Sequence, residues 1–219
     1  MSRGTGRMKI FLDDGDRHMF MLLLADVVTE YALDCYDFCL MNNHFHLSIR
    51  NRRRNLSEAM QKLKGEYASS WNAKRGRVGH TFEGPFRDQI VQDQRYFRTL
   101  ARYIARNPVR AHLVLRPVDW RWSSYRYHAG VEAAPEFLAS ARLLESFAAG
   151  DPEAARRAYI AHVNSMSDGE KDTELFRARR RIVGDAAFRN AIRAKEKALR
   201  AAARPAMFGT DAAFANLPV

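Results

Sequence analysis

The chain has 219 residues, with 36 lysines and arginines against 25 aspartates and glutamates, which gives a formal net charge of +11. A chain of this length can bury a hydrophobic core without disulfides, and its content of 47% apolar and 28% charged residues is typical of a globular protein. These values exclude a disordered or fibrous chain. The positive charge therefore lies on a folded surface and indicates an anionic partner.

No segment of the sequence is suited to a membrane. The longest apolar stretch, Met19 to Ala25, is far shorter than the roughly 20 residues that cross a bilayer. The N-terminus lacks the apolar segment of a signal peptide, so we expect a cytoplasmic protein without membrane contact. Cys35 and Cys39 are expected to be buried apolar residues rather than a disulfide.

The positive charge is concentrated in the middle of the chain. Residues 51–110 carry 14 basic and 5 acidic residues, a net charge of +9. Residues 1–50 have a net charge of −2, and residues 111–219 have one of +4. A polyanion such as a nucleic acid is therefore expected to bind at the central segment.

The first elements in the chain are a helix and a hairpin. Acidic residues from Asp13 onward precede an apolar run, which predicts an N-capped helix that ends near Tyr31. Residues 33–41 and 44–50 both alternate between apolar and polar side chains, and an Asn-Asn step separates them. This pattern is typical of a β-hairpin.

The central segment predicts two more helices and a strand. Apolar residues at helical spacing predict a helix over residues 56–71, and a basic, glycine-containing loop follows at residues 74–80. Residues 86–91 form a candidate strand. Asp93 is expected to cap a helix from about residue 94 to residue 106, where an Asn-Pro step ends it.

This order of elements predicts an α+β fold. With one more strand before the first helix it becomes a ferredoxin-like βαββαβ sheet with helices on one face. We expect this domain over residues 1–130 and a helical C-terminal extension over residues 131–219. The extension should contain three or four helices, with breaks near Gly150, Ser165 and Gly184, and its last 15 residues should be loose.

The predicted hairpin contains a possible metal-binding pair. His44 and His46 are two residues apart on a strand, so both imidazoles leave the same face of the sheet. Two converging neutral ring nitrogens can bind a divalent metal. Such a pair also arises by chance, and two ligands hold a metal poorly, so a third ligand is needed.

The helix near residue 103 offers that ligand. Tyr103 and Asn107 are four residues apart, so the phenol and the amide lie on one helical face. Asparagine can give an oxygen ligand to Mg²⁺ or Mn²⁺, and Tyr103 can be a nucleophile, although a tyrosine here could also only pack on the sheet. Together with the basic segment, these residues predict phosphodiester cleavage. Tyr96 is the alternative nucleophile, but Leu100 rather than asparagine lies four residues after it.

Four segments, in their order and spacing, resemble a known family: CLMNNHFHLSIR, GHTFEGPFRDQIVQD, YFRTLARYIARNPVRAHLV and DWRWSSYRYHAG. Over roughly residues 2–130 the chain is similar to the HUH tyrosine transposases of the insertion-sequence type, in particular the REP-associated tyrosine transposases of bacterial chromosomes. The resemblance implies a ferredoxin-like domain that cuts and rejoins single-stranded DNA at hairpin elements. Most of the family's first strand is missing here, so we expect either that the true start codon lies upstream or that the chain is truncated and its sheet exposes an edge.

The resemblance also implies roles for individual residues. It assigns Mg²⁺ or Mn²⁺ to His44, His46 and Asn107, and it assigns the nucleophile to Tyr103. Attack by the phenol would leave a 5′-phosphotyrosine and a free 3′-OH, which can later rejoin strands without ATP. The protein would act on hairpin-bearing single-stranded DNA as a monomer or a homodimer.

Basic side chains around this site are candidates for contacts to DNA. Arg102 and Arg106 are expected to favour the phenolate of Tyr103. The run at residues 52–54 could hold phosphates near the metal or form a solvated turn, and the aromatic residues within 120–127 are expected to pack on the domain rather than stack on bases. The DNA-binding candidates are Arg52, Arg53, Arg54, Lys74, Arg75, Arg77, His80, Arg87, Arg102 and Arg106.

Two other functions remain open. One is a non-catalytic nucleic-acid-binding module on the same fold. The presence of both histidines, Tyr103 and Asn107 counts against it, because binding alone does not require them. The other is a metal hydrolase with a different substrate, whose further ligands would have to come from Asp34, Asp37 or Asp88.

Overall fold

The computed structural model describes residues 1–92, 94–165 and 181–202. The predicted cap Asp93 and the predicted loose residues 205–219 lie outside these ranges. The strands and helices follow in the order β1 (Ser2–Arg3), α1 (Asp14–Glu30), β2 (Leu33–Leu40), β3 (His44–Asn51), α2 (Leu56–Ala73), β4 (Ile90–Val91), α3 (Gln94–Ala105), α4 (Asn107–Arg110), α5 (Tyr125–His128), α6 (Ser140–Glu145), α7 (Pro152–Asn164), β5 (Ile182–Val183) and α9 (Ala186–Ala202).

The hairpin and the three helices predicted before residue 107 are confirmed, and side-chain caps explain where two helices begin. Part of the predicted helical extension, residues 166–180 and 203–219, lies outside the described ranges. The Asp13 carboxylate accepts a hydrogen bond from the amide of Asp16 at 2.8 Å at the start of α1. Asp151 does the same for the amide of Ala154 at 2.9 Å at the start of α7. Such caps satisfy helix N–H groups that have no partner within the helix.

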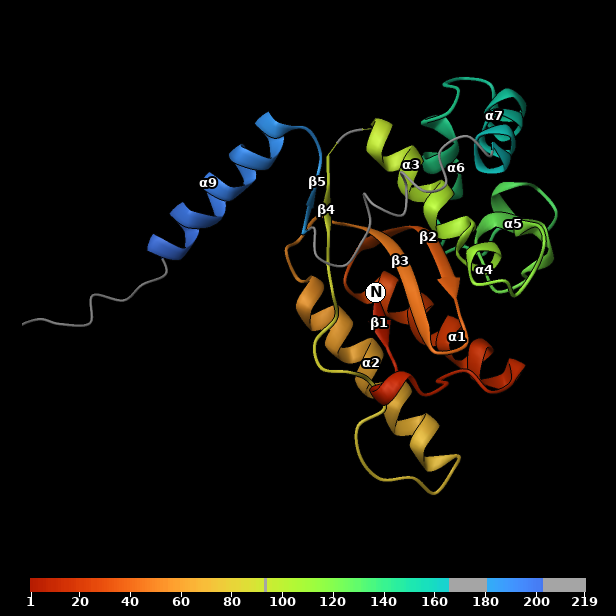
Figure 1. Ribbon diagram of the computed structural model, residues 1–219, viewed down its shortest axis with the longest axis vertical. Helices are drawn as coiled ribbons and strands as arrows, with labels where there is room; N and C mark the ends of the chain where they lie inside the picture. The colour runs from red at the N-terminus through yellow and green to blue at the C-terminus, as the bar shows by residue number, and fades with distance from the viewer. Residues whose placement is uncertain (93, 166–180, 203–219) are drawn as a thin grey trace, which may run out of the picture.

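Three strands form an antiparallel sheet in the order β1-β3-β2 (Figure 1). β2 and β3 pair over almost their whole length, which places Cys39 opposite His46. β1 has only two residues, and its Arg3 lies opposite His44. The mixed α+β class is therefore confirmed, and the first strand is as short as predicted.

The edge expected to be exposed is covered at β1. The segment from Phe82 to Arg87 runs along β1 on the side away from β3. Phe82 forms a bridge with Gly4, and the Arg87 amide donates to the Met1 carbonyl at 2.9 Å. β4 does not join this sheet, because it pairs in parallel with β5 in a separate two-stranded sheet. The structure thus does not reproduce a complete four-stranded ferredoxin-like sheet.

Helices cover both faces of the three-stranded sheet. On one face α1 and α2 share a hydrophobic cluster with the strands, in which the rings of Phe20 and Phe45 have centroids 4.6 Å apart. On the other face Ile104 of α3 packs against Cys39. The expectation of helices on one face is right for α1 and α2 and wrong for α3. Because side chains alternate along a strand, His46 points to the α3 face.

The C-terminal helices differ in how they pack. α7 packs against α3, and α6 packs against α7 and β2. Tyr125 and Tyr159, on either side of the predicted domain boundary at residue 130, belong to one hydrophobic cluster. α9 follows β5 and extends away from the rest of the molecule (Figure 1). Both cysteines are buried and free, as predicted. In the described part of the chain, no helix has the length and apolarity that a membrane span requires.

Candidate active site

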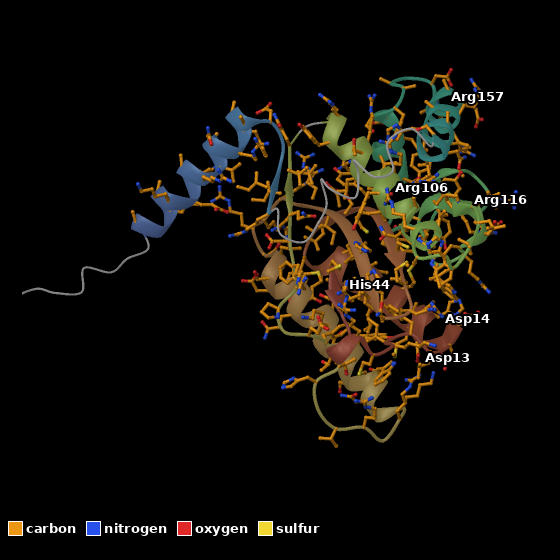
Figure 2. The ribbon with its side chains drawn as sticks, viewed as in Figure 1. Asp13, Asp14, His44, Arg106, Arg116 and Arg157 are labelled. Carbon is orange, nitrogen blue, oxygen red and sulfur yellow. The ribbon has the colours of Figure 1, made fainter. Side chains whose placement is uncertain are left out.

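The histidine strand and the tyrosine helix meet on the α3 face of the sheet. The rings of His46 and Tyr103 lie edge to face with centroids 5.6 Å apart, and the ring of His44 lies 5.0 Å from that of His46. Packing of Ile104 on the strands holds α3 in place, so Tyr103 faces the histidines. Figure 2 shows His44 over the strands. The structure therefore brings three of the predicted site residues together.

Both histidines are neutral at physiological pH. Burial lowers the pKa of His44 to about 4, and the charge of Arg3 adds to this effect. Burial also lowers the pKa of His46 well below its usual value, with a smaller contribution from His44. A neutral imidazole keeps a lone pair on one ring nitrogen, which can bind a metal or accept a proton.

The arrangement of ring nitrogens fits a divalent metal. Nε2 of His46 is buried without a hydrogen-bond partner among the described residues, a costly state unless a ligand satisfies it. Nδ1 of His44 lies 2.7 Å from Oδ1 of Asn43, so Nδ1 donates and Nε2 keeps its lone pair. No group of three or more His, Cys, Asp and Glu side chains could hold a metal within the ranges described. A third protein ligand would therefore be of another type.

Asn107 can supply a ligand of that type. It begins α4, and its Nδ2 donates to the backbone carbonyl of Tyr103 at 2.7 Å. This hydrogen bond holds the amide one turn after Tyr103 and leaves the amide oxygen as the atom that can bind a cation. Its participation with the histidines stays a prediction.

Two arginines that the sequence does not single out act on Tyr103. Cζ of Arg110 lies 4.9 Å from the centroid of the Tyr103 ring, and its Nη1 donates to the Tyr103 carbonyl at 3.0 Å. Burial raises the pKa of Tyr103, whereas the charges of Arg110 and Arg3 lower it. The spacing of seven residues on successive helices could have indicated Arg110. Arg3 reaches the site only through the pairing of β1 with β3, which no local pattern reveals.

The two arginines expected to favour the phenolate reach the end of α7. Nη1 of Arg102 donates to Oγ of Ser165 at 3.1 Å, and Nη1 of Arg106 donates to the carbonyl of Val163 at 3.1 Å. The charges that lower the pKa of Tyr103 are those of Arg110 and Arg3. An effect of Arg102 and Arg106 on the phenolate stays a prediction.

The Arg52–Arg54 run lies at the far end of β3. Arg52 lies six positions after His46, which corresponds to about 20 Å along an extended chain. Arg52 is paired with Asp34 at 2.8 Å, and Arg53 and Arg54 are exposed. The structure does not bring this run to the histidine pair, so phosphate binding near the metal is not supported. Contacts of the run to DNA elsewhere stay a prediction.

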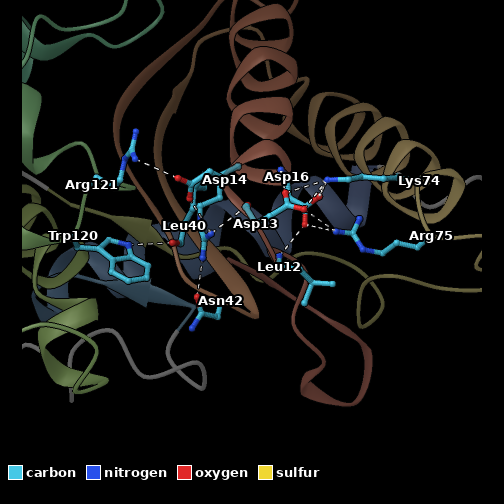
Figure 3. A network of polar contacts seen from close by, with 11 residues as sticks. Leu12, Asp13, Asp14, Asp16, Leu40, Asn42, Lys74, Arg75, Trp120 and Arg121 are labelled. Carbon is cyan, nitrogen blue, oxygen red and sulfur yellow. Dashed lines mark hydrogen bonds and ion pairs between the residues drawn. The ribbon is translucent and has the colours of Figure 1, made fainter.

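Lys74 and Arg75 bind carboxylates at the start of α1 (Figure 3). Nζ of Lys74 lies 2.8 Å from Asp13 and 3.0 Å from Asp16. Nη2 of Arg75 lies 2.6 Å from Asp16, which is fully buried. These two basic residues join α1 to the end of α2. Contacts of either residue to DNA stay a prediction.

A cleft of about 380 Å³ adjoins the reactive side chains. Tyr103, His46 and Arg87 all line it, so the structure brings this predicted DNA-binding residue to the site. Arg77 and His80 are exposed in the loop after α2 and do not line the cleft. The cleft leaves Tyr103 accessible from the surface of the molecule.

The alternative nucleophile and the aromatic residues lie elsewhere. Tyr96 is about 10 Å from Tyr103 along the helix axis and does not line the cleft. Nε1 of Trp120 donates to a strand carbonyl at 3.2 Å, and Trp122 and Tyr125 are buried. These contacts favour Tyr103 over Tyr96 and confirm that the aromatic residues pack on the domain.

The carboxylates required by a metal hydrolase do not form a cluster. Asp34 is paired with Arg52 and Arg142, and Asp37 is buried at 3.2 Å from His128. Asp88 lines the cleft, but no metal-binding group that contains it exists among the described residues. This arrangement counts against the hydrolase alternative.

Part of the chain matches a known protein family. Residues 3–107 match the family model described as Transposase IS200 like. The matched segment spans nearly half of the chain and contains both histidines and Tyr103, with Asn107 as its last residue. No curated protein and no solved structure gives a significant match.

Proposed function

Residues 3–107 belong to the family of IS200-like transposases, and from this premise we propose that the protein cuts and rejoins single-stranded DNA at hairpin elements through Tyr103. The family indicates a transposase, a DNA-processing enzyme. The proposal that Tyr103 cuts DNA is supported by the edge-to-face contact of its ring with His46, whose buried Nε2 has no partner among the described residues.

Tyr103 would supply the nucleophile. Its phenolate oxygen attacks the scissile phosphorus, the bond from phosphorus to the 3′ oxygen breaks, and that oxygen takes up a proton. The 5′ phosphate stays bonded to tyrosine, so the energy of the phosphodiester bond is conserved and a 3′-OH can reverse the step. Arg110 and Arg3 favour the phenolate against the opposing effect of burial.

The residues that would hold Mg²⁺ or Mn²⁺ are His44, His46 and Asn107. When bound, the metal would polarise the scissile phosphate and stabilise charge on its oxygens, an effect worth several kcal/mol. Asn43 orients the ring of His44 through its hydrogen bond to Nδ1. The neutral state of both imidazoles leaves them ready to bind the metal at pH 7.

Covalent trapping tests the proposal. The purified chain, Mn²⁺ and an oligonucleotide with a hairpin and unpaired flanks should give a protein–DNA adduct that survives denaturing electrophoresis and is absent in EDTA. Trypsin cleaves after Arg102 and Arg106, so the DNA should be found on the peptide Tyr103–Arg106, whereas Tyr96 lies in a different peptide. Cleavage of the DNA without any adduct would instead indicate hydrolysis, and no reaction would contradict the proposal.

The contact of Arg110 with Tyr103 predicts a pH effect. In Arg110→Gln the positive charge 4.9 Å from the phenol ring is lost, so the pKa of Tyr103 should rise further. The rate of adduct formation at pH 7.5 should then fall by about tenfold, and the rate should recover at higher pH. Rates measured between pH 6.5 and 9.5 check this shift. Arg106→Gln is the matched control, and an equal shift in both variants would contradict a specific role for Arg110.

A further inference from the structure

The helix α9 carries strong positive charge on an exposed surface. Residues 186–202 include five basic residues and one acidic residue, a net charge of +4. Arg193 and Lys197 are exposed and four residues apart, so they lie on one face of the helix about one turn from each other. The helix extends away from the sheet (Figure 1).

The charge of this face is not compensated within the described part of the molecule. Glu196 is the one acidic residue of α9, and its carboxylate is 3.5 Å from Arg181. Arg193 and Lys197 have no ion-pair partner among the described residues. An exposed cationic stripe of this kind attracts a polyanion through phosphate contacts.

The root of α9 is fixed to the strand that precedes the tyrosine helix. β5 pairs with β4. Nε2 of Gln92 donates a hydrogen bond to the Asp185 carboxylate at 2.8 Å, and Oε1 of Gln92 accepts one from the Asp185 backbone amide at 2.7 Å. Gly184 permits this close packing, because a Cβ atom there would lie 2.5 Å from Oε1 of Gln92 and 2.5 Å from the ring of Phe188. The root of α9 is therefore anchored on β4, whose last residue lies three positions before the start of α3.

The character of α9 favours double-stranded over single-stranded DNA. Proteins bind single strands through aromatic side chains that stack on bases, and the one aromatic residue of α9, Phe188, packs at its root. The helix is about 25 Å long, which matches about seven base pairs of duplex. The basic side chains along α9 can contact successive phosphates of a DNA duplex, which is more rigid than a single strand.

We propose that α9 binds the sugar–phosphate backbone of the duplex stem of the hairpin whose unpaired strand reaches Tyr103. This inference rests on the proposed function, because it assumes a hairpin substrate. It assigns to the same DNA a second contact, on the helix that follows β5. The contact positions the stem without reading its sequence.

Salt-dependent binding tests the inference without cleavage. The affinity of the full chain for a fluorescent hairpin oligonucleotide and for an unpaired oligonucleotide of equal length is measured by anisotropy in EDTA over a range of salt concentrations. In the double variant Arg193→Gln/Lys197→Gln, the slope of log affinity against log salt should decrease by about 2 for the hairpin and should not change for the unpaired strand.

A control with the same charge change separates the local effect from net charge. Arg116 and Arg157 are exposed and lie on the opposite side of the molecule from α9 (Figure 2). The double variant Arg116→Gln/Arg157→Gln should leave the hairpin slope within about 0.5 of the original. Gly184→Ala, which disturbs the root of α9, should lower the preference for the hairpin over the unpaired strand and leave the affinity for the unpaired strand unchanged.

The outcomes distinguish this inference from the proposed function. An unchanged hairpin slope in Arg193→Gln/Lys197→Gln overturns the inference, and so does an equal loss for the hairpin and the unpaired strand. The same proteins are then tested for covalent adducts with Mn²⁺. If adducts form but the α9 variants do not change binding of the stem, the proposed function is supported and the inference about α9 is contradicted. An effect of α9 on stem binding without adducts would support the inference and contradict cleavage.

Discussion

Replacing Tyr103 by phenylalanine should abolish the covalent adduct and lower DNA cleavage by at least about 1000-fold, because the nucleophilic oxygen is removed. The ring itself is retained, so its contacts with His46 at 5.6 Å and with Arg110 at 4.9 Å can remain. Folding and DNA binding should therefore be nearly unchanged. Denaturing electrophoresis and anisotropy, performed on the same preparation, measure the two properties separately.

Tyr96→Phe is the matched control for this variant. It makes the same chemical change on the same helix, at a position that does not line the cleft beside His46. It should form the adduct at the rate of the unchanged protein. An adduct that persists in Tyr103→Phe and disappears in Tyr96→Phe would transfer the nucleophilic role to Tyr96. Activity that persists in both variants without an adduct would favour a metal hydrolase.

The parts of the fold that follow from local patterns could be predicted. The cap at Asp13 and the Asn-Asn step gave the bounds of α1 and the hairpin within about two residues, because capping and turn formation depend on neighbouring residues. The partner of β4 could not be predicted in this way. β5 has only two residues and lies about 90 positions later, and its pairing depends on tertiary contacts. The coverage of β1 by residues 82–87 depends on contacts of the same kind.

In the candidate site too, the features that depend on neighbouring residues could be predicted, and those that depend on tertiary contacts could not. The spacing of His44 and His46, and that of Tyr103 and Asn107, fixes which side chains share a face of a strand or a helix. The charge pattern was less informative, because a count of basic residues does not show which of them are paired. Lys74 and Arg75 contribute to the net charge of the central segment, yet both bind carboxylates at the start of α1. Only the fold separates such residues from those that line the cleft.

Among the ion pairs that join the start of α1 to the end of α2, the buried carboxylate of Asp16 should make the largest single contribution to stability (Figure 3). It accepts hydrogen bonds from the Leu12 amide at 2.8 Å, from Arg75 at 2.6 Å and from Lys74 at 3.0 Å. In Asp16→Asn the side chain keeps its shape but loses its charge, and its NH₂ group adds donors where donors already converge. Since loss of one partner of a buried pair costs about 3–5 kcal/mol and Lys74 is half exposed, we expect a loss of about 2–3 kcal/mol in the free energy of unfolding.

The pH dependence of this loss identifies its cause. Burial alone would raise the pKa of Asp16, but the hydrogen bonds from Leu12, Arg75 and Lys74 outweigh it and hold the pKa below its usual value. The folded state therefore binds fewer protons than the unfolded chain, whose aspartate pKa is about 3.9. The difference in stability between the unchanged protein and Asp16→Asn should be complete above about pH 5 and should shrink as the pH falls through 4 towards 3.

Urea unfolding at pH 7, 5, 4 and 3 measures this difference, and Asp14→Asn provides the control. Asp14 lies two residues earlier, and its exposed carboxylate pairs with Arg121 at 3.3 Å, so the same substitution there should cost less than about 0.5 kcal/mol at every pH. Equal losses at both positions would show that the buried network does not determine stability. A loss in Asp16→Asn that stays constant down to pH 3 would assign the effect to packing rather than to charge, because a packing defect does not titrate.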